Sequence, residues 1–254
     1  MSEPGPVLLC TNDDGINAPG LALLADAAAA HGPIRIVAPD RQQSASSHAL
    51  TLHRPLRLTH VDGDRHTVDG TPTDCVLIAI RDLLDPAPTF VLSGVNHGAN
   101  MGEDILYSGT VAAAMEATIL GVPALAISYV GFEVEHMQTY GPLVSGLIGS
   151  ILAREDFPVG TLLNINLPDI PADETKGVKV TSLGKRVYHD SVTRHLDPRG
   201  REYLWIGGGR SEWHGSDDSD FRAIRAGYVS VTPLHLDLTD FGLIDRVKTW
   251  TLGA

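Results

Sequence analysis

Cysteine is scarce in this chain: only Cys10 and Cys75 occur, and no CxxC motif is present. Because both lie in apolar segments, we interpret them as buried, reduced thiols, with a catalytic thiol as the minor alternative. Thiols of this kind are typical of a cytoplasmic protein, which is the location that we expect. No apolar run approaches about 18 residues, and the N-terminal segment lacks the basic residues of a secretory signal. We therefore predict neither a membrane span nor a signal peptide.

Positive charge is also in deficit. The 254 residues include 19 Lys and Arg against 31 Asp and Glu, which gives a formal net charge of −12. A basic surface for a nucleic-acid polymer is therefore unexpected. The same charge would repel a phosphate-bearing substrate unless a bound cation reverses the local field. Otherwise the composition is that of a globular protein, and the length suits one large domain or one domain with an appendage.

Short apolar segments alternate with helical segments over the first two thirds of the chain. We predict strands at 7–11, 34–38, 90–92, 123–128 and 161–168, with an extended excursion or hairpin at 50–68. We predict helices at 19–31, from the N-cap Thr71 onward, at 110–121 and at 135–154. This alternation indicates an α/β fold of three layers, Rossmann-like, with a mostly parallel sheet and helices on both faces.

The alternation is lost beyond about residue 176, where Gly, Asp and aromatic residues become frequent. We therefore divide the chain into a Rossmann-like core at 1–170 and a C-terminal region at 171–254 that is rich in extended structure. The segment 227–239 has the pattern of a strand that could rejoin the sheet.

Three polar loops follow predicted strands: "NDDG" at 12–15, "PDRQQSASS" at 39–47 and "SGVNHGANMGEDILYSGT" at 93–110. Ligands bind outside the carboxyl ends of parallel strands, so we expect these loops to meet at one edge of the sheet. The adjacent carboxylates of Asp13 and Asp14 repel each other unless a cation joins them. One interpretation is a solvated turn that caps the next helix; the other is a hard cation, Mg²⁺ or Mn²⁺, held by oxygen ligands.

The third loop carries glycines at 94, 98, 102 and 109, which let the backbone approach a ligand closely. Its last residues, Ser108, Gly109 and Thr110, open a predicted helix. The free N–H groups and the dipole at a helix N-terminus form an anion site, and phosphate is the natural anion to meet a metal there. The alternative is an ordinary N-cap followed by a helix.

The segments "TNDDGINAPG", "APDRQQSASSHALT", "GTPTDCV" and "SGVNHGANMGEDILYSGTVAAAMEA" together closely resemble the SurE family, the survival-protein 5′-nucleotidases. The segments "LGKRVYHD", "DPRGREYLWIGG" and "AGYVSVTPLHLDLT" also look like that family, so the resemblance covers nearly the whole chain. It implies a divalent-metal phosphatase that acts on nucleoside 5′-monophosphates. Some members of the family also act on 3′-nucleotides or short polyphosphate.

The resemblance also implies the residues of the site. One divalent cation per subunit, Mg²⁺ or Mn²⁺, would be held by the Asp pair, a serine of the second loop and the Asn of the SGxN motif: Asp13, Asp14, Ser44 and Asn96. The substrate-binding residues would be those that face the phosphate or adjoin the metal pair: Asn12, Asn100, Ser108, Gly109 and Thr110. The chain departs from the family at Ala45 and Ala117, where glycine is usual, and neither is a proposed ligand.

These residues predict hydrolysis by a water that attacks phosphorus in line, with Asp13 or Asp14 as the catalytic base. A covalent route through Ser44 is a minor alternative, because no base is spaced to activate that serine. A zinc site is also only a minor alternative, because zinc needs two or three converging His or Cys ligands and the eleven histidines show no such motif. We expect His97 to line the pocket. The rival functions are a broad acid phosphatase or exopolyphosphatase and a nucleotide-binding protein without turnover.

Two features of the C-terminal region remain. The acidic cluster of Asp217, Asp218 and Asp220 is interpreted as a helix start, with a second metal site as the minor alternative. A monomer would have difficulty covering the aromatic side chains that look exposed, namely Tyr203, Trp205 and Trp213. Members of the resembled family exchange C-terminal segments, so we predict self-association as a dimer or tetramer.

Overall fold

A computed structural model describes residues 6–131, 134–158, 160–188, 192–206 and 211–250 of the chain. These residues form one nine-stranded sheet in the order β3-β4-β2-β1-β5-β6-β7-β13-β8. Its strands are β1 (Leu8–Thr11), β2 (Ile34–Pro39), β3 (Leu58–Asp62), β4 (Arg65–Val68), β5 (Phe90–His97), β6 (Ala124–Tyr129), β7 (Thr161–Leu167), β8 (Val178–Val180) and β13 (Val229–His235). Every neighbouring pair from β4 to β7 is parallel, which confirms the mostly parallel sheet.

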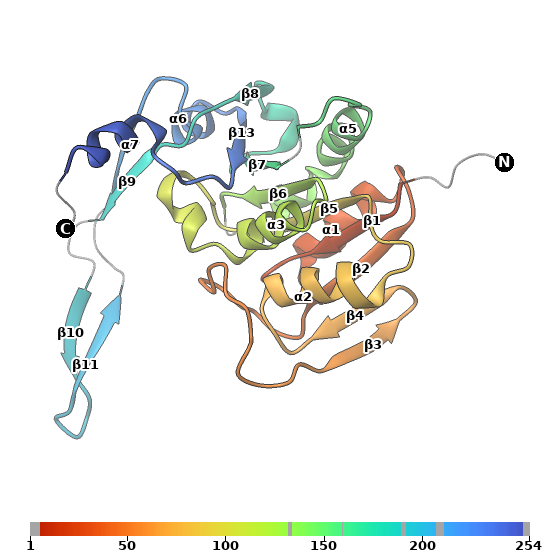
Figure 1. Cartoon of the computed structure of the whole chain (residues 1–254), viewed down its shortest axis with the longest axis horizontal. Helices are drawn as coiled ribbons and strands as arrows, with labels where there is room; N and C mark the ends of the chain where they lie inside the picture. The colour runs from red at the N-terminus through yellow and green to blue at the C-terminus, as the bar shows by residue number, and fades with distance from the viewer. Residues whose placement is uncertain (1–5, 132–133, 159, 189–191, 207–210, 251–254) are drawn as a thin grey trace.

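Helices cover both faces of the sheet (Figure 1). One face carries α1 (Pro19–Ala28), α4 (Val134–Gln138) and α5 (Gly141–Leu152), and the other carries α2 (Pro72–Ile78) and α3 (Gly109–Ile119). Each face has its own hydrophobic core, because alternate residues of a strand point to opposite faces. The three-layer Rossmann-like architecture is therefore confirmed.

The local signals in the sequence act as expected. Thr71 Oγ1 accepts the N–H of Asp74 at 3.1 Å, and Asp74 Oδ2 accepts the N–H of Thr71 at 2.8 Å, so the two residues form a capping box at the start of α2. Pro19 begins α1, where its missing N–H costs no hydrogen bond. Cys10 and Cys75 are free and buried, and burial raises the pKa of the Cys10 thiol to about 12.

Two predicted elements differ from the structure. The helix expected at 135–154 is two helices, α4 and α5, which are separated by a turn at Thr139 and Tyr140, just before Pro142. Pro142 is tolerated only because it lies in the first turn of α5. The strand expected at 90–92 continues to His97, since β5 resumes its pairing with β6 beyond a bulge. The longer β5 carries the third polar loop out to the edge of the sheet.

The C-terminal region contributes to the same sheet. β13 lies between β7 and β8 and runs antiparallel to β7, so the segment with the pattern of a rejoining strand is part of the sheet. The sheet contains strands from both sides of residue 170. The division of the chain at that residue stays a prediction. A short helix, α6 (Asp220–Arg225), precedes β13.

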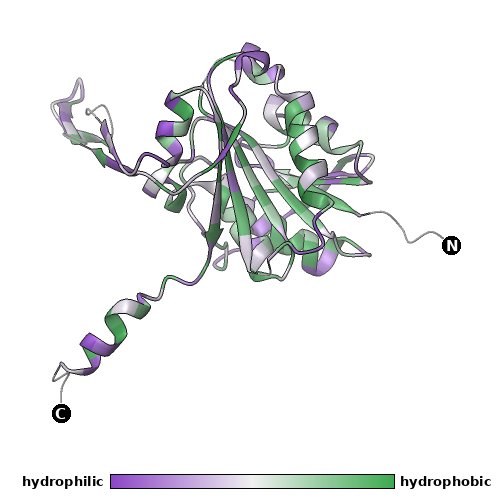
Figure 2. Cartoon of the chain, turned by 90° about the horizontal axis from the view of Figure 1, so that it is seen from above, coloured by the Kyte–Doolittle hydropathy of each residue, from purple (hydrophilic) through white to green (hydrophobic). Residues whose placement is uncertain are grey.

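Two further parts extend away from the body of the molecule. β9 (Lys185–Tyr188) pairs with β12 (Ser211–His214), and beyond them β10 (Val192–Leu196) pairs with β11 (Glu202–Ile206) in a hairpin that projects outward (Figure 1). The helix α7 (Phe241–Lys248) also stands apart from the sheet (Figure 2). No helix in the described part of the chain has the length and apolar character needed to cross a membrane.

Candidate active site

Hydrogen bonds join the three polar loops at the carboxyl end of the parallel strands. The N–H of Gln43 in the second loop donates to the carbonyl oxygen of Asp13 in the first, at 2.7 Å. The N–H of Ser47 donates to the carbonyl oxygen of Tyr107 in the third loop, at 3.1 Å. At the end of β5, the backbone of the third loop also donates to Asp14 Oδ2 at 3.2 Å. Each loop therefore contacts the other two.

Asn12 closes the turn that presents the two carboxylates. Its Nδ2 donates to the carbonyl oxygen of Gly15 at 3.0 Å, and its Oδ1 accepts the N–H of the same residue at 3.1 Å. Gly15 has a φ of +98°, and a Cβ there would lie 3.2 Å from the carbonyl carbon of Arg41, so the turn requires glycine. Asn12 was expected to bind substrate, but both ends of its amide are used within the turn. Its geometry is that of a residue that positions Asp13 and Asp14.

Asp13 belongs to the first polar loop and lies against the first residue of α3, with 4% of its surface exposed. Its Oδ1 accepts a hydrogen bond from Thr110 Oγ1. Burial raises the pKa of the Asp13 carboxyl to about 6; the Thr110 hydrogen bond opposes this rise, and the charge of Asp14 adds to it. The protein alone therefore compensates the ionised carboxylate poorly, and the position suits a cation.

Asp14 is held beside the end of β5, next to Asn96. Asp14 Oδ2 accepts the backbone N–H of His97 and lies 3.3 Å from His97 Nδ1. Asn96 Nδ2 donates to the carbonyl oxygen of Gly98 at 2.8 Å, which orients the amide and leaves Oδ1 for a ligand. Gly94 permits the close pairing that brings Asn96 here, because a Cβ on Gly94 would lie 2.2 Å from a carbonyl oxygen of β6.

The serines of the second loop differ in their surroundings. Ser44, the expected metal ligand, is exposed, and its Oγ accepts a hydrogen bond from Gln42 Nε2 at 2.9 Å. Within the described residues, Ser44 makes no hydrogen bond to the Asp pair. Ser46, which sequence reasoning missed, has a buried Oγ that would lie 2.9 Å from a Cβ built on Gly109. The run "SASS" carries no signal that tells which hydroxyl turns inward.

The end of the third loop forms the N-terminus of α3. Ser108 Oγ accepts the N–H of Val111 at 3.1 Å, so Ser108 is the N-cap of the helix. Gly109 and Thr110 follow as its first two residues, and Thr110 reaches the Asp13 carboxylate through its hydroxyl. Ser108 can cap the helix while the same helix end binds an anion, because the Ser108 side chain satisfies only one of the free N–H groups.

Asn100 is buried and bound by polar side chains of β6 and β7. Its N–H donates to Asn166 Oδ1 at 3.0 Å, and its Nδ2 donates to Ser128 Oγ at 2.7 Å. Its carbonyl oxygen accepts Asn164 Nδ2 at 2.8 Å and Asn166 Nδ2 at 2.9 Å. Sequence reasoning also missed these three partners. The available signal was a polar side chain inside an apolar strand, which needs a hydrogen-bond partner when buried.

Within the acidic cluster of the C-terminal region, Asp220 supports the third loop from outside the site. Asp220 is buried at the first residue of α6, and its oxygens accept the N–H of Gly102 at 2.8 Å and of Gly184 at 2.9 Å. Burial raises the pKa of this carboxyl. Asp217 is exposed and pairs with Arg222 at 3.2 Å. The interpretation as a helix start is confirmed for Asp220. Across the described ranges, no group of three or more His, Cys, Asp or Glu side chains is placed to hold a metal ion.

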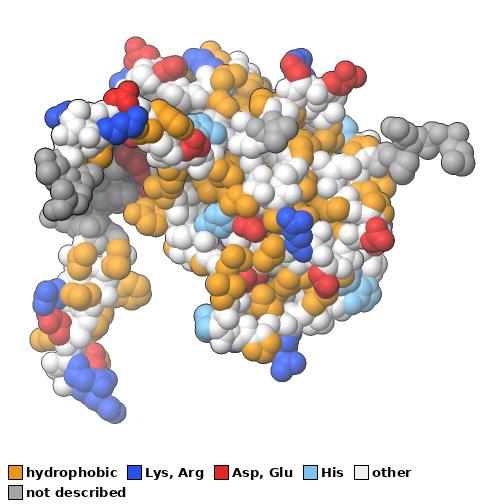
Figure 3. All heavy atoms as spheres, in the orientation of Figure 1, with side chains coloured by type: hydrophobic (Ala, Val, Ile, Leu, Met, Phe, Trp, Pro, Cys, Tyr) orange, Lys and Arg blue, Asp and Glu red, His pale blue; other side chains and the backbone are white. Residues whose placement is uncertain are grey.

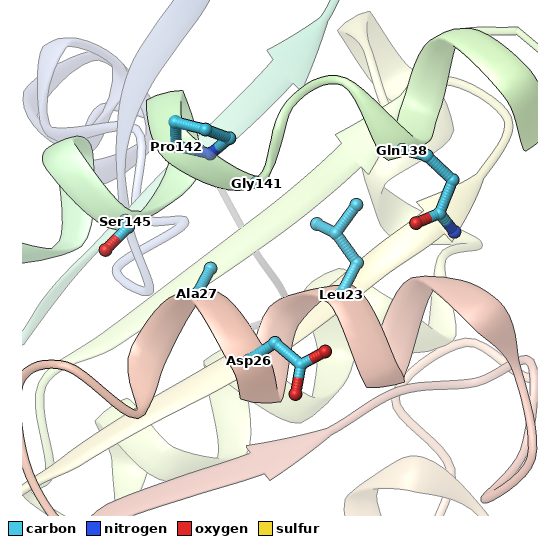
Figure 4. Close-up of a pocket in the computed structure, with 7 residues that line it drawn as sticks. All are labelled: Leu23, Asp26, Ala27, Gln138, Gly141, Pro142 and Ser145. Atoms are coloured by element: carbon cyan, nitrogen blue, oxygen red, sulfur yellow. The ribbon is translucent and has the colours of Figure 1, made fainter.

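A cavity of about 330 Å³ lies between α1 and the α4–α5 segment (Figure 4). Its lining residues are Leu23, Asp26, Ala27, Gln138, Gly141, Pro142 and Ser145, and none of them belongs to the polar loops. Asp26 is the sole ionisable side chain among these lining residues. We assign no part of the chemistry to this cavity.

Both the sequence and the fold are similar to those of known proteins. Residues 8–190 match a family model described as "Survival protein SurE". The 5′-nucleotidase SurE of Gemmatimonas aurantiaca is 53% identical over 246 residues, which cover 96% of this chain and 98% of the relative. The 5′-nucleotidase SurE of Geotalea uraniireducens is 47% identical over 245 residues, with 96% and 99% covered. The crystal structure of the SurE protein from Aquifex aeolicus matches with a TM-score of 0.85 at 42% identity, covering 96% of this chain and 98% of that one.

Proposed function

The chain belongs to the SurE family, and on that premise we propose that it is a 5′-nucleotidase, a hydrolase that removes phosphate from nucleoside 5′-monophosphates. The main support for the proposal is the similarity to a relative that is named for this activity, which is 53% identical over 96% of the chain. The geometry of the site supports it, because two carboxylates and a helix N-terminus meet at the carboxyl edge of the sheet.

The proposed activity includes one divalent cation, Mg²⁺ or Mn²⁺, in each subunit. Its candidate ligands are all oxygen atoms, from Asp13, Asp14, Ser44 and Asn96, and hard divalent cations prefer oxygen. The raised pKa of the Asp13 carboxyl supports the fit, because a cation would compensate this buried charge. When bound, the cation polarises phosphoryl oxygens and promotes ionisation of water near neutral pH.

The residues of the chain have separate roles in the proposed hydrolysis. The N-terminus of α3, residues 108–110, offers N–H groups to the phosphate, and Asn100 is a further proposed substrate-binding residue. A water oxygen attacks phosphorus, and the bond from phosphorus to the 5′ oxygen breaks in line with the attack. Asp13 or Asp14 accepts the proton that the water loses. The 5′ oxygen takes up a proton and leaves as the hydroxyl of the nucleoside, and inorganic phosphate is the second product.

A metal-by-substrate activity measurement tests the proposal. Phosphate release should be measured from AMP, GMP, 3′-AMP and short polyphosphate with Mg²⁺, with Mn²⁺ and with excess chelator. We expect release from the 5′-monophosphates with metal and its loss on chelation. Absence of release from every nucleotide with either metal would refute the proposed function, and a clear preference for polyphosphate would favour the exopolyphosphatase alternative.

Self-association as a dimer or tetramer is the second part of the proposal. Apolar side chains are prominent along the β10–β11 hairpin (Figure 3), where Trp205 is 63% exposed and Ile206 is 86% exposed. Phe241 at the start of α7 is 67% exposed. Trp213, also expected to be exposed, is instead half-buried, because it stacks on Phe221 with ring centroids 5.3 Å apart.

An apolar cavity beside the third loop offers a place for such side chains. It measures about 590 Å³ and lies between the third loop, α3 and the C-terminal region. Its apolar lining comes from Ile105, Leu106, Met115, Leu183, Leu234 and Leu238. Light scattering at micromolar concentration tests the assembly, and we expect the mass of a dimer or a tetramer. A monomeric mass over the whole concentration range would contradict this part of the proposal.

A further inference from the structure

Ser46 carries a hydroxyl that is buried without a hydrogen-bond partner at the edge of the candidate site. Among the residues that the structure describes, no donor or acceptor pairs with Ser46 Oγ. An unpaired buried hydroxyl is unfavourable, because it has lost its bonds to water and gained none in return. Such a group in a native fold requires an explanation, and a ligand that supplies the missing bond is one.

The position of Ser46 links the proposed cation to the proposed phosphate site. A Cβ built on Gly109 would lie 2.9 Å from Ser46 Oγ, 2.8 Å from Asp13 Cβ and 3.1 Å from Asp13 Oδ2. The hydroxyl and the carboxylate thus both lie against the first residue of α3. Because Gly109 has no side chain, a ligand can reach the N–H groups of this helix end. A phosphoryl group bound there would lie within reach of Ser46.

The backbone on each side of Ser46 adopts an unfavourable conformation. Ala45 has a φ of +57° and Ser47 has a φ of +53°. Residues with a Cβ seldom occupy this left-handed region, and they do so most often at functional sites. The two turns of the backbone place Ser46 inward while Ser44 stays exposed.

Contacts to the first loop, the third loop and α3 hold the loop in this conformation. The N–H of Ser46 donates to the carbonyl oxygen of Gln43 at 3.2 Å, and the backbone of Gln43 and Ser47 bonds to the first and third loops as described above. Farther along, His48 Nε2 lies 2.8 Å from Glu116 Oε2, a buried carboxylate of α3. The hydroxyl of Ser46 is therefore preorganised by both ends of its loop.

We propose that Ser46 is a further substrate-binding residue, whose Oγ donates a hydrogen bond to an oxygen of the phosphoryl group. The inference rests on the proposed nucleotidase function and adds a donor to the phosphate site of that function. It also gives different roles to two serines of one loop: Ser44 is the proposed cation ligand, and Ser46 is the proposed phosphate ligand.

Three matched variants test this separation, namely Ser44→Ala, Ser46→Ala and Ser47→Ala. Each removes one hydroxyl from the same loop, and Ser47 is the control because its described hydrogen bond comes from the backbone N–H. Titration calorimetry gives the affinity of chelator-treated protein for Mn²⁺ and the affinity of Mn²⁺-loaded protein for inorganic phosphate. Steady-state kinetics with AMP give KM and kcat, and thermal unfolding verifies that each variant is folded.

For Ser46→Ala we expect the Kd for phosphate and the KM for AMP to rise about 10-fold or more, since a bond to a charged group is lost. Its Kd for Mn²⁺ should equal that of the wild type. Ser44→Ala should instead raise the Kd for Mn²⁺, and Ser47→Ala should change neither constant.

Two results would overturn the inference alone, with an active wild-type protein as the reference. One is equal phosphate affinity in Ser46→Ala and Ser47→Ala. The other is a weakened affinity of Ser46→Ala for Mn²⁺, which would make this hydroxyl a metal ligand. A wild-type protein that neither binds phosphate nor hydrolyses AMP would overturn the proposed function and this inference together.

Discussion

The polar site at the sheet edge and the apolar C-terminal extensions are held in opposite ways. In the site, Asp13 and Asn100 are 4% and 6% exposed, and their hydrogen-bond partners come from the same chain. In the extensions, Trp205 and Ile206 are 63% and 86% exposed, although they are among the more apolar side chains of the region. One chain thus suffices to organise the site residues, whereas the extensions leave apolar area that a single chain does not cover.

The two regions differ because hydrogen bonds and apolar contacts stabilise a folded chain in different ways. Hydrogen bonds are directional and short, so a few neighbouring strands and loops can satisfy a buried polar side chain completely. Apolar stabilisation grows with the area removed from water, which a two-stranded hairpin or an isolated helix cannot provide for itself.

Removal of a site carboxylate should have the largest effect. We expect Asp13→Asn or Asp14→Asn to lower kcat/KM for AMP by about 100- to 1000-fold, because the proposed cation loses a charged ligand. The melting temperature should change little, since an amide oxygen can still accept the existing hydrogen bonds. The control is Asp26→Asn, in the cavity of Figure 4, which should keep full activity. Unchanged turnover in both site variants would remove the basis for the metal assignment.

A charge on the hairpin should have the next largest effect. Ile206→Glu should raise the dissociation constant of the assembly by about 100-fold, because a carboxylate would be buried in an apolar interface. Light scattering over a dilution series measures this change. The affinity for Mn²⁺ should stay within about threefold of the wild type, as all proposed ligands come from one chain. The control is Arg199→Glu at the polar tip of the hairpin. If both variants retain the wild-type mass, the hairpin is not the interface.

Asp220 lies where the third loop meets the C-terminal region, and its replacement should have an intermediate effect on stability. Asp220→Asn should lower the free energy of unfolding by about 2 kcal/mol, because one N–H group would face an amide nitrogen instead of an acceptor. Urea denaturation measures the loss. The exposed Asp217→Asn is the matched control. Equal stability of the two variants would mean that Asp220 does not join the regions.

The cap of α7 should give the smallest effect. Asp240 accepts the N–H of Leu243 at 3.1 Å, so Asp240→Ala should destabilise this helix by about 1 kcal/mol. Asp240→Asn keeps a capping oxygen and should restore the helix. Circular dichroism and light scattering follow the change, while kcat for AMP should stay constant. A fall in kcat with Asp240→Ala alone would show that the extension and the site are coupled.

Much of the core could be predicted because its signals are local. The capping box at Thr71 and the run of apolar residues in β1 depend on residues within a few positions of one another. The length of β5 could not be predicted in this way, because its last residues form a strand only through pairing with β6. The same holds for the partners of Asn100, whose side chains lie on strands that come later in the chain.

The alternation of strands with helices, and the place of Asp13 and Asp14 just after a strand, could be predicted from the sequence, because periodicity and capping arise between near neighbours. Tertiary packing, in contrast, selects the serine of the second loop that turns toward Gly109 and the apolar surfaces that stay uncovered. The backbone of Ala45 and Ser47 is set by contacts to loops far away in the sequence. Burial, likewise, depends on how distant elements pack, so a pattern of residue types can place a polar loop at the site but cannot say which of its hydroxyls faces inward.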